Sequence, residues 1–408
     1  CLQSTRGDNR SKMRVLSVTA QKPCSTGSGV YLTEVVRSLA KMGVSQAVVA
    51  GVTREDRVDM PEGVTVYPVY FSSEKLPYPV VGMSDEMPYT STRYRDMTEE
   101  MAGQFKAAFL EVLDEAIEKE NPDIILCHHL YYLTALIRAH YPAKKVYGFC
   151  HNTDLRQMES ILFERNFIRQ EIPKLDRIFA LQEAQKEKIK KIYPVSEKQM
   201  TVIGTGYNSE VFKKTGIKLS RKDGKIRMIF AGKITQKKGV KSLLRALNLL
   251  DYEKEKIQLI LAGGAGNLVE YEEIKELADG CRYPVVFAGC VTQSRLAELY
   301  NDCDIFVLPS MYEGLPLTVI ESLACGDRVV MTKLEGIAEW LADMVPDADI
   351  RYVLPPGMKG TDEPLEEELP AFESRLAEAL REAIEEKDTK ECDVSRISWQ
   401  KIAREVIR

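Results

Sequence analysis

Apolar runs that alternate with helical stretches, and do so twice, are the feature that most constrains the fold of this chain. In the first half the helical stretches include 31–42 and 97–120. The apolar runs of that half are 14–18, 47–50, 64–69, 123–127, 145–150 and 177–181. Alternation of this kind is typical of a mostly parallel sheet with helices on both faces.

The same pattern starts again at Ile226 and indicates a second unit. Its apolar runs are 227–231, 257–262, 284–287, 304–308 and 328–331. We therefore expect an α/β protein of two doubly wound, Rossmann-like domains in tandem, joined by the polar stretch 207–224. Ligands bind at the carboxyl ends of the strands in such sheets, so we expect a central cleft that both domains line.

The two ends of the chain carry simpler patterns. The acidic stretch 362–386 has leucine and alanine at helical spacing, which favours a solvated amphipathic helix over a binding tail. The terminal stretch 398–407 resembles another short amphipathic helix. Residues 1–12 are polar and lack the apolar segment of a signal peptide. We expect Met13 to be the functional start, and residues 1–12 to be either added sequence or a disordered arm.

Composition and charge exclude several classes of protein. The 408 residues are 44% hydrophobic and 29% charged, as in a globular protein of two or three domains. With 56 basic and 61 acidic residues, the chain is a poor candidate for binding nucleic acid. No apolar stretch is long enough to span a membrane, whereas peripheral membrane contact stays open. Nine cysteines without a Cys-x-x-Cys pair favour a reducing cytoplasm over disulfides or zinc.

A glycine-rich turn follows the first predicted strand and opens a helix. Gly27 and Gly29 would let the backbone approach a ligand, and the helix N-terminus would offer free N–H groups to an anion. A plain tight turn between strand and helix explains the same residues. Leu32 stands where a dinucleotide-binding motif needs its third glycine, and no acidic residue ends the second strand. NAD is therefore disfavoured.

A lysine cluster follows the first strand of the second domain. Lys233, Lys237 and Lys238 lie between that strand and the next helix, so we expect them at the carboxyl end of the strand. Cations in this position suit a diphosphate, whose negative charge grows as it leaves. The alternative is a solvated lysine patch.

Two glutamates flank the start of a later helix. Pro316 suits a first helical turn, so Glu313 is expected in the preceding loop and Glu321 inside the helix, on the face that carries Thr318. Carboxylates on one wall of a cleft accept hydrogen bonds from sugar and ribose hydroxyls. The alternative for Glu313 is a partner of the helix dipole.

Three of the four histidines end predicted strands. These are His128, His129 and His151, and His151 is the best candidate for a polar catalytic group because Asn, Thr and Asp follow it. We interpret His140 as a structural residue. No spacing of histidines indicates a metal site.

Two other segments are open to more than one interpretation. Asp302 and Asp304 form an Asp-x-Asp pattern that can hold a metal, but Asp304 begins an apolar run and the pair is expected at the amino end of that strand. The segment 70–95 is rich in tyrosine, proline and methionine, and its aromatic rings suit a sugar or a flat acceptor. A plain surface loop is the alternative there.

These motifs, in this order, resemble one family, the retaining glycosyltransferases of family four with the two-domain GT-B fold. The resemblance extends over the chain from Met13. The most specific motif is the pair Glu313 and Glu321, separated by seven residues, within 308–326. Supporting segments are 202–208, 232–239 and the terminal Ser398-Trp399.

The resemblance implies an architecture and a reaction. It implies an acceptor domain at 13–208, a donor-nucleotide domain at 225–392, and a helix at 393–408 that crosses back onto the first domain. The reaction would move a hexose-type sugar from a nucleoside diphosphate sugar to an unknown glycan, lipid or small molecule, with retention at the anomeric carbon. No cofactor and no obligatory metal are implied. Two alternatives stay open: a non-catalytic nucleotide-sugar-binding protein, and an epimerase or phosphorylase on the same fold.

The resemblance also implies roles for individual residues. Lys233 and Lys238 would hold the donor diphosphate, and His151 would stand near the sugar and the acceptor. Glu313 would bind hydroxyls of the transferred sugar. The residues implied in donor binding are Gly27, Gly29, Glu321, Leu317 and Thr318.

Three positions depart from the family pattern. Lys233 stands where arginine is usual, which replaces bidentate phosphate contact by a single-point attraction. Asp327-Arg328 replaces a small residue and a proline, and Leu334-Glu335-Gly336 replaces a glycine pair near the donor site.

Overall fold

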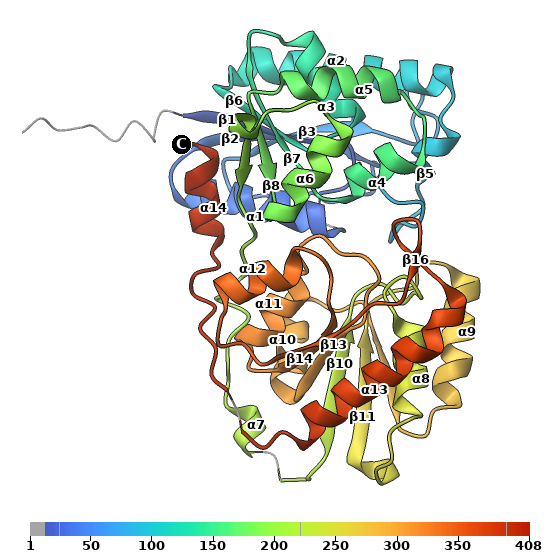
Figure 1. Ribbon diagram of the computed structural model, residues 1–408. Helices are drawn as coiled ribbons and strands as arrows, with labels where there is room; N and C mark the ends of the chain where they lie inside the picture. The colour runs from blue at the N-terminus through green and yellow to red at the C-terminus, as the bar shows by residue number, and fades with distance from the viewer. Residues whose placement is uncertain (1–12, 24, 221, 389) are drawn as a thin grey trace, which may run out of the picture. The chain divides into compact units, whose positions relative to one another are not determined.

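The computed structural model describes residues 13–23, 25–220, 222–388 and 390–408 (Figure 1). Residues 1–12, for which the sequence suggested added sequence or a disordered arm, lie outside this range. The chain divides into two compact units. The first runs to Thr205 and also includes Trp399–Arg408, and the second is Gly206–Ser398.

The first unit is built on a parallel sheet of seven strands in the order β3-β2-β1-β6-β7-β8-β9. The strands are β1 (Arg14–Thr19), β2 (Ser45–Val52), β3 (Thr65–Tyr70), β6 (Ile124–His128), β7 (Lys145–Phe149), β8 (Arg177–Ala180) and β9 (Met200–Val202). The six strands predicted from apolar runs are confirmed. The sequence did not indicate β9, because three residues are too few to form a recognisable apolar run.

Helices cover both faces of this sheet. Val48 of β2 packs with Leu32 of the first helix, whereas its neighbour Val49 packs with Phe105 and Phe109 of the second. Successive strand side chains point to opposite faces, so these two helices lie on opposite sides. The remaining elements of the unit are α1 (Gly27–Lys41), α2 (Glu99–Glu120), α3 (Tyr132–His140), α4 (Thr153–Ser160), α5 (Arg165–Glu171), α6 (Glu183–Ile192), and the short strands β4 (Val81–Gly82) and β5 (Thr92–Arg93).

The last helix, α14 (Trp399–Val406), packs on α1 of the first unit (Figure 1). It buries Trp399 and Ile402, and the Trp399 ring meets the Tyr31 ring edge-on at 4.9 Å between centroids. Arg177 Nη2 lies 2.8 Å from Glu405 Oε1. The expected return of the chain end to the first unit is confirmed.

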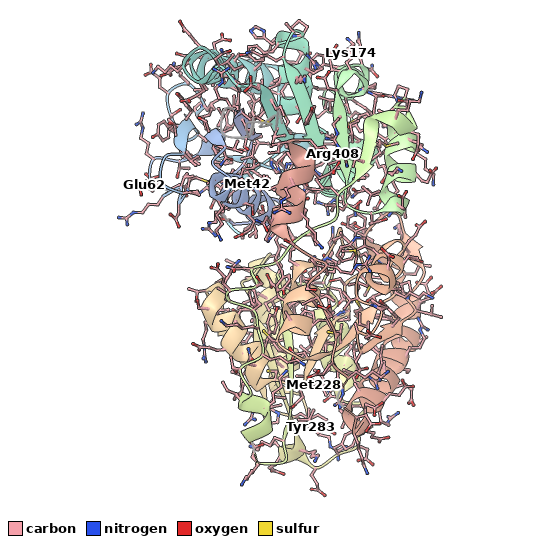
Figure 2. The ribbon with its side chains drawn as sticks, turned by 90° about the vertical axis from the view of Figure 1, so that its left-hand side faces the viewer. Met42, Glu62, Lys174, Met228, Tyr283 and Arg408 are labelled. Carbon is pink, nitrogen blue, oxygen red and sulfur yellow. The ribbon has the colours of Figure 1, made fainter. Side chains whose placement is uncertain are left out.

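The second unit has a parallel sheet of six strands in the order β12-β11-β10-β13-β14-β15. The strands are β10 (Ile226–Ala231), β11 (Ile257–Ala262), β12 (Val285–Gly289), β13 (Ile305–Leu308), β14 (Arg328–Thr332) and β15 (Ile350–Val353). The helices are α7 (Ile217–Ser220), α8 (Val240–Leu247), α9 (Leu268–Asp279), α10 (Gln293–Asp302), α11 (Leu317–Ala324), α12 (Ile337–Met344) and α13 (Leu369–Glu385). Met228 and Tyr283, which Figure 2 labels, are buried in this unit.

Two predictions in this unit need correction. The acidic helix begins at Leu369 rather than at 362, because residues 358–364 form a hairpin of β16 (Met358–Lys359) and β17 (Glu363–Pro364). The predicted linker 207–224 is partly ordered structure, since it contains α7 and buries Phe212 against Tyr300. None of the helices in the described part of the chain is long and apolar enough to cross a membrane.

Candidate functional site

Three loops interlock at the carboxyl edge of the second sheet: 232–239 after β10, 263–266 after β11 and 309–316 after β13. Two backbone contacts join them. Ile234 N donates to Gly264 O at 2.9 Å, and Met311 N donates to Lys237 O at 2.9 Å.

Two glycines make this close packing possible. Gly239 has a φ of +76°, and a Cβ there would lie 2.0 Å from the carbonyl oxygen of Pro309. Gly263 has a φ of +145°, and its Cβ would lie 1.7 Å from the carbonyl oxygen of Gly232. Any side chain at either position would force the loops apart. The glycine turn after β11 therefore has a packing role.

The central pair of this edge is Lys238 and Glu313. Lys238 Nζ lies 2.5 Å from Glu313 Oε1, and Ser310 Oγ donates to the same oxygen at 2.6 Å. The two side chains are 29% and 12% exposed, so water screens their attraction only in part. A cation and a carboxylate are thus fixed side by side at the end of the sheet, although 75 residues separate them along the chain.

Other candidates of this unit lie on the same loops and on α11. Glu321 is buried within α11. The burial of Tyr300 raises the pKa of that tyrosine well above its ordinary value, and the nearby charge of Glu321 adds to this effect. Leu317 and Thr318 form the first turn of α11 and are partly exposed. Lys233 follows β10 directly and is partly exposed.

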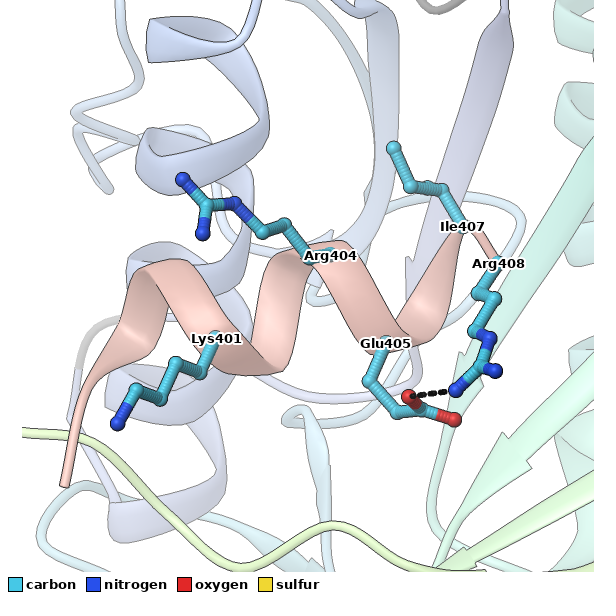
Figure 3. A pocket seen from close by; sticks show the side chains of 5 residues that line it. All are labelled: Lys401, Arg404, Glu405, Ile407 and Arg408. Atoms are coloured by element: carbon cyan, nitrogen blue, oxygen red, sulfur yellow. Dashed lines mark ion pairs between the residues drawn. The ribbon is translucent and has the colours of Figure 1, made fainter. Parts of the chain in front are cut away.

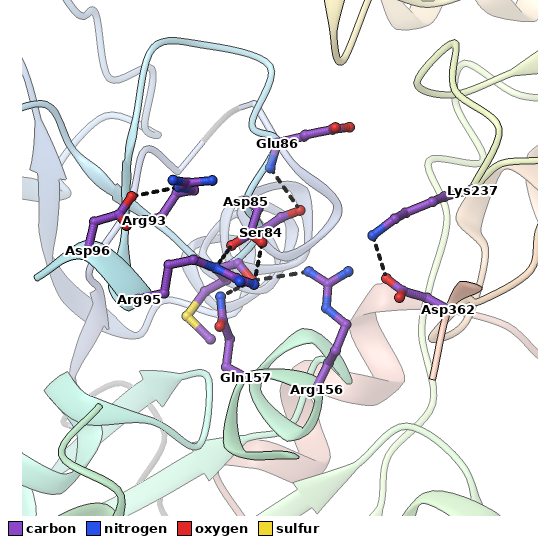
Figure 4. Close-up of polar contacts among 11 residues, drawn as sticks. Ser84, Asp85, Glu86, Arg93, Arg95, Asp96, Arg156, Gln157, Lys237 and Asp362 are labelled. Carbon is purple, nitrogen blue, oxygen red and sulfur yellow. Dashed lines mark hydrogen bonds and ion pairs between the residues drawn. The ribbon is translucent and has the colours of Figure 1, made fainter. Parts of the chain in front are cut away.

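Lys237 differs from the other two lysines because it has a partner in the β16–β17 hairpin. Its Nζ lies 3.1 Å from Asp362 Oδ2 (Figure 4). This ion pair attaches the hairpin to the loop after β10. Both ammonium groups bind carboxylates, but Lys237 is half-exposed whereas Lys238 is partly buried, so a role in holding a diphosphate stays a prediction for this cluster.

In the first unit, the turn before α1 is open around Gly27. Thr26 Oγ1 accepts a hydrogen bond from Gly29 N at 3.1 Å and so caps α1. A Cβ at Gly27 would meet no atom of the described residues within 4 Å, and its φ is not one that only glycine adopts. The conformation and packing of the turn therefore do not require glycine at 27. This favours the interpretation that Gly27 lets a ligand approach the backbone.

The histidines at the carboxyl edge of the first sheet gather into one cluster. His128 Nδ1 lies 3.0 Å from His151 Nε2, and the two rings stack with centroids 5.2 Å apart. His129 meets His151 edge-on at 5.0 Å. Burial lowers the pKa of His128 and of His129 to about 3, and burial beside these two rings lowers that of His151 as well. All three imidazoles are neutral at pH 7.

Sequence reasoning singled out His151 but missed that His128 is its partner. A signal was present, because both residues end neighbouring apolar runs and neighbouring parallel strands bring their ends together. In the sheet, His128 of β6 pairs with Phe149 of β7, two residues before His151. His140 lies apart, exposed, with Nε2 3.7 Å from Asp114 Oδ1.

Several aromatic rings of the segment 70–95 pack in the core of the first unit. Tyr78 and Tyr94 are buried, and the Tyr94 ring packs edge-on against Tyr131. Two side chains bind the backbone of Met83. Gln157 Nε2, whose residue Figure 4 labels, donates to Met83 O at 2.9 Å. Met83 N donates to Gln21 Oε1 at 3.1 Å. Part of the aromatic content of this segment is therefore structural, and a role of the segment in binding an acceptor stays a prediction.

The Asp-x-Asp pattern serves a structural purpose. Asp304 Oδ2 accepts from Arg227 N at 2.8 Å, and Asp302 Oδ2 lies 3.7 Å from Arg227 Nε. Within the described ranges, no group of three or more His, Cys, Asp or Glu side chains is arranged to hold a metal ion.

An open pocket lies elsewhere on the first unit, along α14. It is lined by Lys401, Arg404, Glu405, Ile407 and Arg408 (Figure 3). Glu405 pairs with Arg177 and also lies 3.7 Å from Arg408. None of the candidate site residues lines this pocket, and the carboxylate in it serves to dock α14.

One departure from the family pattern has a structural reason. Asp327 is buried, and its Oδ1 accepts a hydrogen bond from Lys218 Nζ of α7, while Oδ2 has no partner among the described residues. Burial outweighs the attraction of Lys218 and raises the pKa of Asp327 to about 7. Arg328 Nε lies 3.4 Å from Asp349 Oδ2. Both residues thus form ion pairs within the second unit, Asp327 with Lys218 and Arg328 with Asp349.

The raised pKa of Asp327 predicts a pH dependence of stability. The folded state holds the proton more tightly than the unfolded state, whose pKa is near 3.8. Protonation of Asp327 therefore stabilises the folded state fully below about pH 4, and this contribution is lost as the pH rises to about 7. Relative to Asp327→Asn, the free energy of unfolding of the wild type should fall by roughly 4 kcal/mol at most over this range. Urea unfolding of both proteins at pH 4 to 8 measures it, and a constant difference would contradict the assignment.

Comparison with known proteins now identifies the family. Residues 25–211 match the model of Glycosyltransferase Family 4, and residues 212–368 match that of Glycosyl transferases group 1. The chain belongs to the family four glycosyltransferases. Two models that meet at residue 212 and together run from 25 to 368 correspond to the two α/β units of this glycosyltransferase.

Individual relatives of this glycosyltransferase are distant. It is 25% identical over 346 residues to D-inositol 3-phosphate glycosyltransferase 2 of Catenulispora acidiphila, covering 78% of this chain and 76% of that protein. It is 29% identical over 172 residues to an uncharacterized glycosyltransferase of Methanocaldococcus jannaschii, covering 40% and 44%. An alignment with alpha-maltose-1-phosphate synthase of Mycobacterium tuberculosis covers 56% of this chain and 61% of that protein at 24% identity. The matches to the last two of these relatives thus span only 44% and 61% of their length.

Solved structures establish the GT-B fold. Sucrose-phosphate synthase from Thermosynechococcus elongatus superposes with a TM-score of 0.68 at 16% identity, over 97% of both chains. Anabaena HepE, in complex with UDP and glucose, superposes with a TM-score of 0.62 at 15% identity, over 97% of this chain and 98% of that one.

Proposed function

We propose that this chain transfers a hexose-type sugar from a nucleoside diphosphate sugar to an acceptor hydroxyl, with retention at the anomeric carbon. The observation that carries this proposal is the Lys238–Glu313 pair at the carboxyl edge of the second sheet. A nucleotide sugar presents a diphosphate and sugar hydroxyls only a few bonds apart. The cation can bind the diphosphate while the carboxylate beside it accepts hydrogen bonds from the sugar hydroxyls.

Different residues of the second unit bind different groups of the donor. Lys238 and Lys233 stabilise the diphosphate as negative charge collects on the leaving oxygen. Glu313 accepts hydrogen bonds from hydroxyls of the transferred sugar, and Glu321, deeper in α11, accepts those of the ribose. Leu317 and Thr318 line the donor at the start of that helix.

The residues of the first unit serve the other end of the reaction. The open backbone at Gly27 and the capped start of α1 at Gly29 allow a phosphate or a hydroxyl to approach the helix N-terminus. His151, at the carboxyl edge of the first sheet, contacts the sugar or the acceptor. Because HepE is known in complex with UDP and glucose, a uridine diphosphate sugar is the first donor to test.

Two measurements test the function. A ligand at one hundred times its Kd adds about 2.7 kcal/mol to the free energy of unfolding, so a thermal-shift panel of UDP, GDP and ADP and their sugars should show one nucleotide that stabilises the chain. Release of the free diphosphate is then followed with and without a panel of glycan, lipid and small-molecule acceptors. Release that depends on an acceptor supports transfer. Binding without release would indicate the non-catalytic alternative, and conversion of the donor sugar without an acceptor would indicate an epimerase.

Turnover is expected to survive chelation. Lysine ammonium groups supply the positive charge that a divalent cation supplies to the leaving diphosphate in metal-dependent transferases. The rate with and without EDTA should therefore agree within about twofold. Complete loss in EDTA, with recovery on addition of magnesium or manganese, would contradict this mechanism.

A further inference from the structure

The hydrogen bond between two neutral histidines constrains where their protons are. His128 Nδ1 and His151 Nε2 are 3.0 Å apart, which is hydrogen-bond distance. A neutral imidazole has one N–H donor and one acceptor nitrogen, so one ring must donate and the other accept. Two arrangements are possible, and they differ in which nitrogen of His128 carries its proton.

The surroundings of His128 decide between these arrangements. Its other nitrogen, Nε2, is buried and has no hydrogen-bond partner in the described part of the chain. If His151 donated, His128 would carry its proton on Nε2, as a buried N–H without an acceptor. Such orphaned donors are rare in folded proteins. His128 therefore carries its proton on Nδ1 and donates it to His151.

This arrangement determines which nitrogen of His151 carries the proton. Its Nε2 accepts from His128, so the proton of the neutral ring is on Nδ1. This Nδ1 makes no hydrogen bond to a described residue and is not among the buried nitrogens without a partner. His151 as a residue is partly exposed. The backbone N–H of His151 binds Asp154, so this carboxylate is bonded to the backbone of the turn and not to the His151 ring. The hydroxyl of Tyr31, whose ring contacts His151, is already used in donating to Gly204 O at 2.9 Å.

We infer that His128 is a positioning residue that holds His151 in the Nδ1–H tautomer, so that His151 offers its ligand a hydrogen-bond donor and not a proton acceptor. The inference rests on the proposed function, in which His151 contacts the sugar or the acceptor. The group that His151 recognises is then an oxygen with a free lone pair. Removal of the acceptor proton falls to another group.

Nitrogen NMR on the full chain tests the tautomer without any ligand or activity. The protein has four histidines, so the spectrum of a ¹⁵N-histidine-labelled sample is simple. At pH 7 we expect His151 to show a protonated Nδ1 and an unprotonated Nε2, and His128 to show a protonated Nδ1. His151→Gln assigns its signals, and exposed His140 is the internal reference for a histidine outside the cluster. A His151 signal from the Nε2–H tautomer or from an imidazolium would overturn the inference, whether or not the chain transfers sugar.

Kinetics of two His128 variants test what the tautomer does. Phenylalanine keeps the ring stack and removes the donor, whereas the amide nitrogen of asparagine can replace Nδ1. His128→Phe should lower kcat about tenfold, with the donor KM unchanged, and should release His151 into mixed tautomers. His128→Asn should recover most of the rate and the single tautomer. Equal losses in both variants, with the His151 tautomer unchanged, would show that His128 only packs.

Discussion

Replacing Lys238 by alanine should lower kcat by roughly a hundredfold or more while the KM for the donor changes only a few-fold. The diphosphate is already charged in the ground state, and one more negative charge develops on the leaving oxygen as the glycosidic bond breaks. A fixed cation that is only 29% exposed gains most at that moment, because little water screens it. Loss of one such group costs about 3 kcal/mol in the barrier.

The control for this variant follows from the structure. By sequence alone Lys237 would be the obvious neighbour to test, but its ion pair with Asp362 holds the β16–β17 hairpin. Lys241, in the first turn of α8, pairs instead with the exposed Glu273 on α9. Lys241→Ala should leave kcat and KM unchanged, because its carboxylate partner lies on α9 and not on the loops at the carboxyl edge of the sheet. A Lys238→Ala enzyme with normal kcat and raised KM would contradict the role in leaving-group stabilisation.

Substitutions of Glu313 and Glu321 should have different effects, one on sugar transfer and the other on nucleotide binding. Glu313→Ala should abolish detectable transfer and leave the affinity for the nucleoside diphosphate intact or slightly higher, because Lys238 loses its competing partner. Glu321→Gln should weaken that affinity by about 10- to 100-fold, since hydrogen bonds to a charged group contribute roughly 1.5–3 kcal/mol. Calorimetric titration with the diphosphate, alongside transfer assays, measures both.

Two checks protect this comparison. Glu321 is buried, so the unfolding temperature of Glu321→Gln must be measured to separate lost binding from lost structure. Glu298, exposed on α10 and paired with Arg295, provides a neutral comparison as Glu298→Ala. Equal losses of diphosphate affinity in the Glu313 and Glu321 variants would refute the division of roles.

The local pattern of the sequence determined most of the elements of this fold. Apolar runs such as 123–127 are too short and too uniformly apolar for amphipathic helices, and they became buried strands. Pro316 marked the start of α11, so Glu313 was correctly expected in the loop before it and Glu321 inside the helix. The position of a residue at the carboxyl end of a strand was therefore readable, because it depends only on neighbours along the chain.

What the sequence did not determine are the contacts between residues far apart along it. The pairing of Lys238 with Glu313, and of Lys218 with the buried Asp327, depends on which loops meet at the end of a sheet. The burial of Tyr78 and Tyr94 depends likewise on what packs above them. Strand order and side-chain packing are set by the summed burial of the whole core, to which each local segment contributes little.

The histidine cluster shows most clearly which properties the sequence determined and which depend on the tertiary structure. From the sequence, His128 and His151 are two polar residues that each follow an apolar run. Only the adjacency of β6 and β7 in the sheet brings His128 Nδ1 within 3.0 Å of His151 Nε2. Only burial on one side leaves His128 Nε2 without a partner among the described residues. The sequence by itself determined that imidazoles stand at this edge. The tertiary structure decided which nitrogen carries each proton, because that depends on how many hydrogen-bond partners the surrounding elements provide.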